Sequence, residues 1–135
     1  MSDQTTVPED FRDLLDAQIA TLATIGPDGR PQLSAVGFLH DNGALKLSLH
    51  ETRQKTKNLR RNPAVNLFVL DRQNPMRYLE IRGDGELVDD RDYAFADTIS
   101  AKHGGVNLRQ IDGDDQRRVV VSIRPTRVVA VDLSA

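Results

Sequence analysis

Closely spaced turn sequences constrain this chain most, because they leave room only for short extended segments between them. Residues 26–29 (Gly-Pro-Asp-Gly) and 41–43 (Asp-Asn-Gly) both have the composition of tight reversals. Residues 31–39 between them are mostly apolar, and residues 44–50 alternate leucine with polar side chains, as a half-buried strand does. The first half of the chain is therefore predicted to form antiparallel hairpins.

The rest of the chain continues in short elements. Further strands are predicted at 19–25, 64–70, 78–88 (with a bulge or bend at 83–85), 119–123 and 128–133, the last two separated by Pro125. Short helices are predicted at 8–18, 52–61 and 91–103, with Asp89 and Asp90 as caps of the third. Six or seven strands linked by hairpins pair mostly antiparallel, and closing the sheet into a barrel removes its exposed edges.

Length and composition favour one mainly β domain over residues 1–135. Aromatic residues make up 4% and tryptophan is absent, so the interior must be built from Val, Ile, Leu and Ala. A net charge of −2 provides no general attraction for nucleic acid or an anionic membrane, and no segment approaches the roughly 20 apolar residues of a membrane span. Without cysteine, disulfides and thiolate chemistry are excluded. We expect a cytoplasmic protein, and 14 Arg against 4 Lys is typical of a GC-rich actinobacterial genome.

One basic segment stands out from this acidic background. Residues 53–61 hold five basic residues in nine positions, and they open the helix predicted at 52–61. A helix start offers unsatisfied N–H groups and a partial positive charge, to which Arg53 and Lys55 add full charges. The segment is therefore a candidate phosphate site, and a solvated basic helix face is the alternative.

No side-chain pattern for acid–base, nucleophilic or metal catalysis is present. The sequence has no Ser-His-Asp ordering, no HExxH and no nucleophile elbow, and its three histidines are scattered. Only His50, at a strand end near the basic segment, is a candidate for contact with a coenzyme or substrate. Residues 112–115 (Asp-Gly-Asp-Asp) lack the alternating ligands and distal Glu of a calcium loop, so a solvated loop is predicted there.

The order of several short motifs resembles a known superfamily. Leu-Ala-Thr at 22–24 and the turn at 26–31 precede residues 32–36, Asn-Leu-Arg-Arg-Asn-Pro at 58–63 and Arg-Tyr-Leu-Glu-Ile-Arg-Gly at 77–83. Together they resemble the pyridoxamine 5'-phosphate oxidase-like split β-barrels. Within these, the chain looks most like the small branch that uses the deazaflavin coenzyme F420 rather than the longer FMN branch.

The resemblance implies an antiparallel Greek-key split β-barrel that forms a homodimer with two coenzyme sites at the subunit interface. Arg53 and Lys55 would bind the coenzyme phosphate, the segment 48–50 would lie beside the ribityl chain, and strand 32–36 would offer backbone groups to the ring. The segment 77–81 would meet the coenzyme from the partner subunit. The implied coenzyme-binding residues are Gln32, Leu33, Ser34, Ala35, Val36, Ser48, His50, Arg53, Lys55, Thr56, Lys57, Arg77 and Tyr78.

The resemblance further implies an oxidoreductase that transfers hydride from reduced F420 to an electron-poor small molecule. F420 carries a phospholactyl linker and a polyglutamate tail where FMN ends in one phosphate, so Lys57, Arg60 and Arg61 would provide useful extra cations. Exposed charge pairs contribute only about 0–1 kcal/mol each, so these cations favour F420 without deciding the choice. Two alternatives stay open: an FMN-binding oxidoreductase of the same fold, and a coenzyme carrier without turnover.

Overall fold

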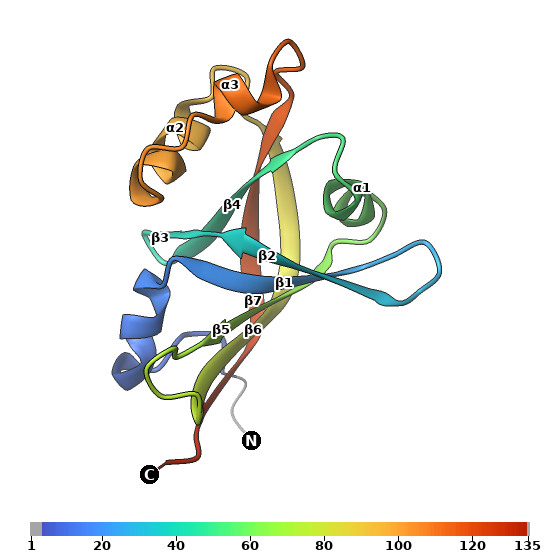
Figure 1. Ribbon diagram of the computed structural model, residues 1–135. Helices are drawn as coiled ribbons and strands as arrows, with labels where there is room; N and C mark the ends of the chain where they lie inside the picture. The colour runs from blue at the N-terminus through green and yellow to red at the C-terminus, as the bar shows by residue number, and fades with distance from the viewer. Residues whose placement is uncertain (1–3, 135) are drawn as a thin grey trace.

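The computed structural model describes residues 4–134, within which seven strands form one antiparallel sheet (Figure 1). The strands are β1 (Ile19–Ile25), β2 (Pro31–Gly37), β3 (Leu39–Asp41), β4 (Ala44–His50), β5 (Ala64–Leu70), β6 (Arg77–Asp89) and β7 (Arg118–Asp132). Their spatial order is β2-β1-β5-β6-β7-β4-β3, and the sheet curls until β2 approaches β4. The predicted mainly β, split-barrel fold is confirmed.

Short helices decorate this sheet. They are the 3-10 helix η1 (Glu9–Asp16) and the α-helices α1 (Gln54–Arg61), α2 (Ala94–Lys102) and α3 (Leu108–Asp112), of which α3 was not predicted. Helix α2 begins later than predicted because Tyr93 has a φ of 60°, outside the helical region. Of the two predicted caps, Asp90 is confirmed, since it accepts hydrogen bonds from the N–H groups of Phe95 (3.2 Å) and Ala96 (2.9 Å), whereas Asp89 is the last residue of β6. No helix within residues 4–134 has the length and apolar character needed to cross a membrane.

The interior is aliphatic, as the composition predicts. In β4 and β5 every second residue is buried, so the alternating leucines at 45, 47 and 49 all line the interior of the barrel. Phe11, Leu14 and Leu15 of η1 are also buried, and they join the same core.

The last strand corrects the sequence analysis. Two strands separated by Pro125 were predicted, but β7 runs unbroken through this proline. Pro125 pairs with Gly83 at a register shift between Arg82 and Gly83, where a strand can accommodate a residue without an N–H. The bend predicted at 83–85 lies at this shift, and a Cβ at position 83 would collide with the carbonyl oxygen of Arg124.

Candidate functional site

A groove of about 530 Å³ is lined by residues from β2, β4, the start of α1 and the end of α3. Its volume lies within the roughly 300–1,000 Å³ usual for small-molecule and cofactor sites. Residues 35–37 of β2 form one side and residues 48–50 of β4 the other, where the two strands approach without pairing. We call this the coenzyme groove.

Helix α1 begins at the coenzyme groove. The side chains at its start are positively charged, whereas the helix dipole favours negative charge there. Arg53 is the N-cap residue, Lys55 follows it in the first turn, and that turn contains no acidic residue. Cations near the positive end of a helix are unfavourable, whereas an anion there is stabilised. The helix start is nevertheless fixed in place, because the buried hydroxyl of Thr56 donates to the carbonyl oxygen of His50 at 2.7 Å.

The two cations at this helix start have no acidic partner within residues 4–134. The guanidinium of Arg53 makes no side-chain hydrogen bond there, and Lys55 Nζ donates only to Ser34 Oγ, at 3.3 Å. Burial of the ammonium lowers the pKa of Lys55, and the positive charges of Arg53 and Arg118 lower it further. Such a cluster of like charges attracts an anion.

His50 is held by its neighbours on both ring nitrogens. The N–H of Thr52 donates to Nδ1 at 3.2 Å, so Nε2 carries the hydrogen and donates to the carbonyl oxygen of Asp115 at 2.8 Å. The imidazole lines the coenzyme groove and ties the loop after α3 to the end of β4. This arrangement suits a positioning role better than proton transfer.

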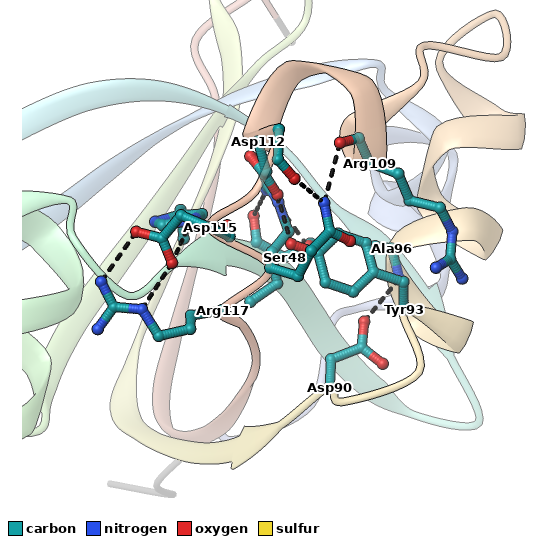
Figure 2. A network of polar contacts seen from close by, with 12 residues as sticks. Ser48, Asp90, Tyr93, Ala96, Arg109, Asp112, Asp115 and Arg117 are labelled. Carbon is teal, nitrogen blue, oxygen red and sulfur yellow. Dashed lines mark hydrogen bonds and ion pairs between the residues drawn. The ribbon is translucent and has the colours of Figure 1, made fainter.

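A buried polar network positions α3 as a wall of the coenzyme groove. Arg118 donates to Asp112 through Nε (2.7 Å) and Nη2 (3.0 Å), and Tyr93 Oη donates to the same carboxylate at 2.7 Å. Figure 2 shows Tyr93 and Asp112 in this network, with Asp115 nearby. Burial opposes ionisation of Asp112, but the hydrogen bonds from Arg118 and Tyr93 outweigh it and lower its pKa. Burial and the bond to Asp112 raise the pKa of Tyr93 to about 12, so the phenol stays a donor.

The structure brings part of the predicted coenzyme-binding set together. The predicted residues that line the coenzyme groove are Ala35, Val36, Ser48, His50, Arg53 and Lys55. Ser34 is reached through its hydrogen bond from Lys55, and Thr56 is buried under the helix start. Lys57 is exposed on α1, Leu33 is 65% exposed on β2, and Gln32 lies in a neighbouring groove.

Arg77 and Tyr78 lie away from the coenzyme groove of the same chain. Arg77 donates to Asp13 at 2.6 Å and to Asp71 at 3.1 Å, and its guanidinium lies 4.8 Å from the ring centre of Phe11. Successive strand residues point to opposite faces, so Tyr78 lies on the outer face of the sheet, with its ring 5.2 Å from that of Phe68. The contact of Arg77 and Tyr78 with a partner's coenzyme stays a prediction. The ion pairs of Arg77 argue against it, because they already engage its guanidinium.

Sequence reasoning missed half of the groove. Leu49 belongs to the segment 48–50 that was predicted beside the ribityl chain, and the lining residues outside every predicted binding segment are Gly37, Thr52, Ile111, Asp112, Asp115 and Arg118. Residues 112–115 were predicted to form a solvated loop. This prediction is wrong for Asp112, whose side chain is only 4% exposed. No local sequence pattern marks Arg118, which opens β7 directly opposite His50. That register follows only from the tertiary pairing of β4 with β7.

The residues present fit a coenzyme that joins a flat ring to a phosphate. Arg53, Lys55 and the start of α1 provide charge and donors for the phosphate. β2 is an edge strand, and in an antiparallel ladder alternate residues direct their N–H and C=O groups away from the neighbour. Part of segment 32–36 therefore has free backbone groups for a polar ring edge, although the side chains of that segment do not all face the groove.

Comparison with known proteins agrees with this geometry. A family model described as pyridoxamine 5'-phosphate oxidase matches residues 7–132. A solved structure named F420 Reductase is 37% identical, with a TM-score of 0.82, over 91% of this chain and 98% of its own.

Two further structures extend the comparison. A conserved hypothetical protein from Mycobacterium tuberculosis is 26% identical, with a TM-score of 0.77, over 98% of this chain and 88% of its own. A putative pyridoxamine 5'-phosphate oxidase from Listeria innocua is 23% identical, with a TM-score of 0.71, over 94% of this chain and 98% of its own. At that identity the likeness shows the shared fold alone.

Proposed function

The chain belongs to the pyridoxamine 5'-phosphate oxidase family, and from this premise we propose that it is an oxidoreductase that uses coenzyme F420. Its coenzyme groove would hold the deazaflavin, and an electron-poor organic molecule would accept hydride. The likeness to the structure named F420 Reductase supports this choice of coenzyme.

One observation carries the proposal: two cations converge on the groove without acidic partners. Elsewhere in residues 4–134, seven of the other thirteen arginines pair with a carboxylate, as Arg60 does with Glu51 and Arg118 with Asp112. Arg53 and Lys55 do not, although the pKa of Lys55 is lowered by burial and by like charges. A bound phosphate would relieve this repulsion.

The chain's own task in such a reaction is placement. Reduced deazaflavin would supply the hydride, and the proton that the acceptor then needs would come from the ring N–H of the coenzyme or from water, so no nucleophile is required from the protein. Arg53 and Lys55 would fix the phosphate end, and the free edge of β2 would orient the ring. The wall formed by α3, held by Asp112 and Arg118, would exclude water from one side of the groove.

We also propose that the active form is a homodimer. Apolar side chains are incompletely covered on the outer face of β1, β5, β6 and β7, among them Ile19 (48% exposed), Leu70 (40%), Phe68 and Tyr78. Cross-strand pairing brings Leu70, Tyr78 and Val131 side by side. A second copy covering this face would bring Tyr78 toward its partner, as predicted. Sedimentation should then give twice the 15.0 kDa chain mass, and a strictly monomeric particle would contradict the proposal.

Titration with coenzyme F420 and with FMN tests the proposed function. We expect F420 to bind with micromolar affinity or better, and reduced F420 in the complex to be oxidised faster when a panel of enones and quinones is added. Binding of neither coenzyme would overturn the proposal. Tight binding of F420 without faster oxidation by any acceptor would indicate a carrier.

One observation favours FMN as the second candidate. Of the extra cations that would suit the tail of F420, Arg60 is paired with Glu51 and Arg61 donates to the carbonyl oxygen of Ile25. Of these three cations, Lys57 alone is exposed with neither an ion pair nor a side-chain hydrogen bond to another described residue. A protein that is purified yellow and releases FMN on denaturation would support this alternative over F420.

A further inference from the structure

A second groove of about 480 Å³ lies beside the coenzyme groove, and nothing in the proposed function uses it so far. It is lined by the β1–β2 hairpin, residues 26–31, and by the side chains of Gln32, Gln54 and Asn58. We call it the hairpin groove. Figure 1 shows the hairpin extending below α1 in this view, and both elements contribute residues to the lining of the groove.

The hairpin groove continues the coenzyme groove along the same strand. Residues 35–37 of β2 line the coenzyme groove, whereas Pro31 and Gln32 line the hairpin groove. Ser34 lies between them and accepts a hydrogen bond from Lys55. At the start of α1 the two grooves take neighbouring residues: Arg53 and Lys55 line the coenzyme groove, and Gln54, between them in sequence, lines the hairpin groove. A phosphate held by Arg53 and Lys55 would therefore lie where the two grooves meet.

The polar groups in the hairpin groove match an amide. The buried Asn58 donates from Nδ2 to Gln32 Oε1 at 3.0 Å and to Thr24 Oγ1 at 3.1 Å, and it accepts from Gln54 Nε2 at 2.8 Å. These bonds leave Gln32 Nε2 and Gln54 Oε1 without a partner in residues 4–134. One free donor and one free acceptor, both anchored on Asn58, can bind the C=O and N–H of a peptide-like link.

The groove also offers a cation for a carboxylate. The guanidinium of Arg30 is exposed and makes no ion pair with any described residue. The nearby Asp28 uses its carboxylate to accept a hydrogen bond from the backbone N–H of Arg30 at 3.0 Å. Pro27 and Pro31 fix the backbone on either side, which limits the ordering cost of binding an extended chain.

We infer that the hairpin groove binds the glutamyl tail of coenzyme F420, with Gln32 and Gln54 on its amide links and Arg30 on a tail carboxylate. The inference rests on the proposed function. The tail would then be bound by two carboxamides and one arginine, on the side of α1 that faces the β1–β2 hairpin. Arg60 and Arg61 are already engaged by Glu51 and Ile25.

Fluorescence titration of the purified protein tests the inference. It compares F420 that carries several glutamates with F420 that carries none. The wild type should bind the tailed form more tightly. In the variant Arg30→Ala, whose site is exposed, this advantage should fall about fivefold, the effect of losing roughly 1 kcal/mol of exposed charge interaction. Affinity for the tailless form should not change.

The matched control is Arg72→Ala, which also removes one exposed arginine charge. Arg72 follows the C-terminal end of β5, which lies away from α1. It should keep the full tail advantage. Equal affinities of the wild type for the two forms, or an unchanged advantage in Arg30→Ala, would overturn the inference while leaving the proposed function intact. Failure of the wild type to bind the tailless form as well would overturn both.

Discussion

Arg53 with Lys55, at the start of α1, and Arg77, at the start of β6, are cations that the sequence assigned to the same coenzyme, but their surroundings differ. Arg77 is 13% exposed and bound by two carboxylates, and these hydrogen bonds raise its pKa. Arg53 and Lys55 line the coenzyme groove and are bonded to no carboxylate of residues 4–134, and the pKa of Lys55 is lowered by burial and by neighbouring positive charges.

This difference separates two uses of a cation. A paired cation stabilises the fold, because removing it leaves carboxylates without their partner. Unpaired cations that gather at one place repel one another, so they contribute to stability only when an anion binds. The comparison therefore predicts that substitutions at the two places affect different measurements.

The largest effect is expected at the unpaired cations. The double variant R53A/K55A should lose about 3–6 kcal/mol of coenzyme binding, since each charged hydrogen bond contributes roughly 1.5–3 kcal/mol. Its melting temperature should stay near that of the wild type, because no ion pair is lost. Calorimetric titration and thermal melts check both, and unchanged affinity in the folded variant would refute the phosphate site.

The next largest effect is expected where a substitution turns a paired cation into an unpaired one. In Asp112→Asn the nearly buried Arg118 loses its carboxylate, which should lower the free energy of unfolding by about 3 kcal/mol. Arg118 would then be a free cation on the coenzyme groove, so affinity for an anionic coenzyme should hold or rise. Chemical denaturation and titration measure the two effects. Loss of affinity from an otherwise folded variant would show that Asp112 itself is needed for binding.

A smaller loss of stability is expected at the paired cation. Arg77→Met keeps much of the contact with Phe11 but removes the bonds to Asp13 and Asp71, which should cost about 2 kcal/mol of unfolding free energy. Coenzyme affinity of the remaining folded protein should change little. A large drop in affinity at unchanged stability would instead support the predicted contact of Arg77 with the partner's coenzyme.

The smallest effect is a gradual dependence on pH. Lys55 has a pKa below the ordinary 10.5, so it loses its proton earlier than a free lysine does as pH rises. Coenzyme affinity should decline as pH approaches 10.5 from below and should be retained at lower pH. In Lys55→Arg the guanidinium stays charged, so this decline should be absent. Titrations across this range check the difference, and identical profiles would exclude Lys55 as the titrating group.

Features encoded locally could be predicted from the sequence. The alternation of leucine at 45, 47 and 49 predicts β4 and its buried face, and the turn residues at 26–29 predict the first hairpin. The cations at 53 and 55 were likewise visible, because helix start and charge lie within a few residues.

Features that depend on distant partners could not be predicted. Whether Arg77 is paired depends on Asp13, far along the chain, and Arg118 joins the groove only through the pairing of β4 with β7. β7 continues through Pro125 because Gly83 lies opposite it. Helix α3 has five residues and no buried face, so it leaves no apolar period in the sequence.

A crystal structure of the protein with coenzyme F420 bound tests the phosphate site most directly. It should show the phosphate within hydrogen-bond distance of both Arg53 and Lys55 at the start of α1, with the ring on the side of residues 35–37. A phosphate bound elsewhere, out of hydrogen-bond reach of both side chains, would contradict the assignment even if the coenzyme occupied another part of the barrel.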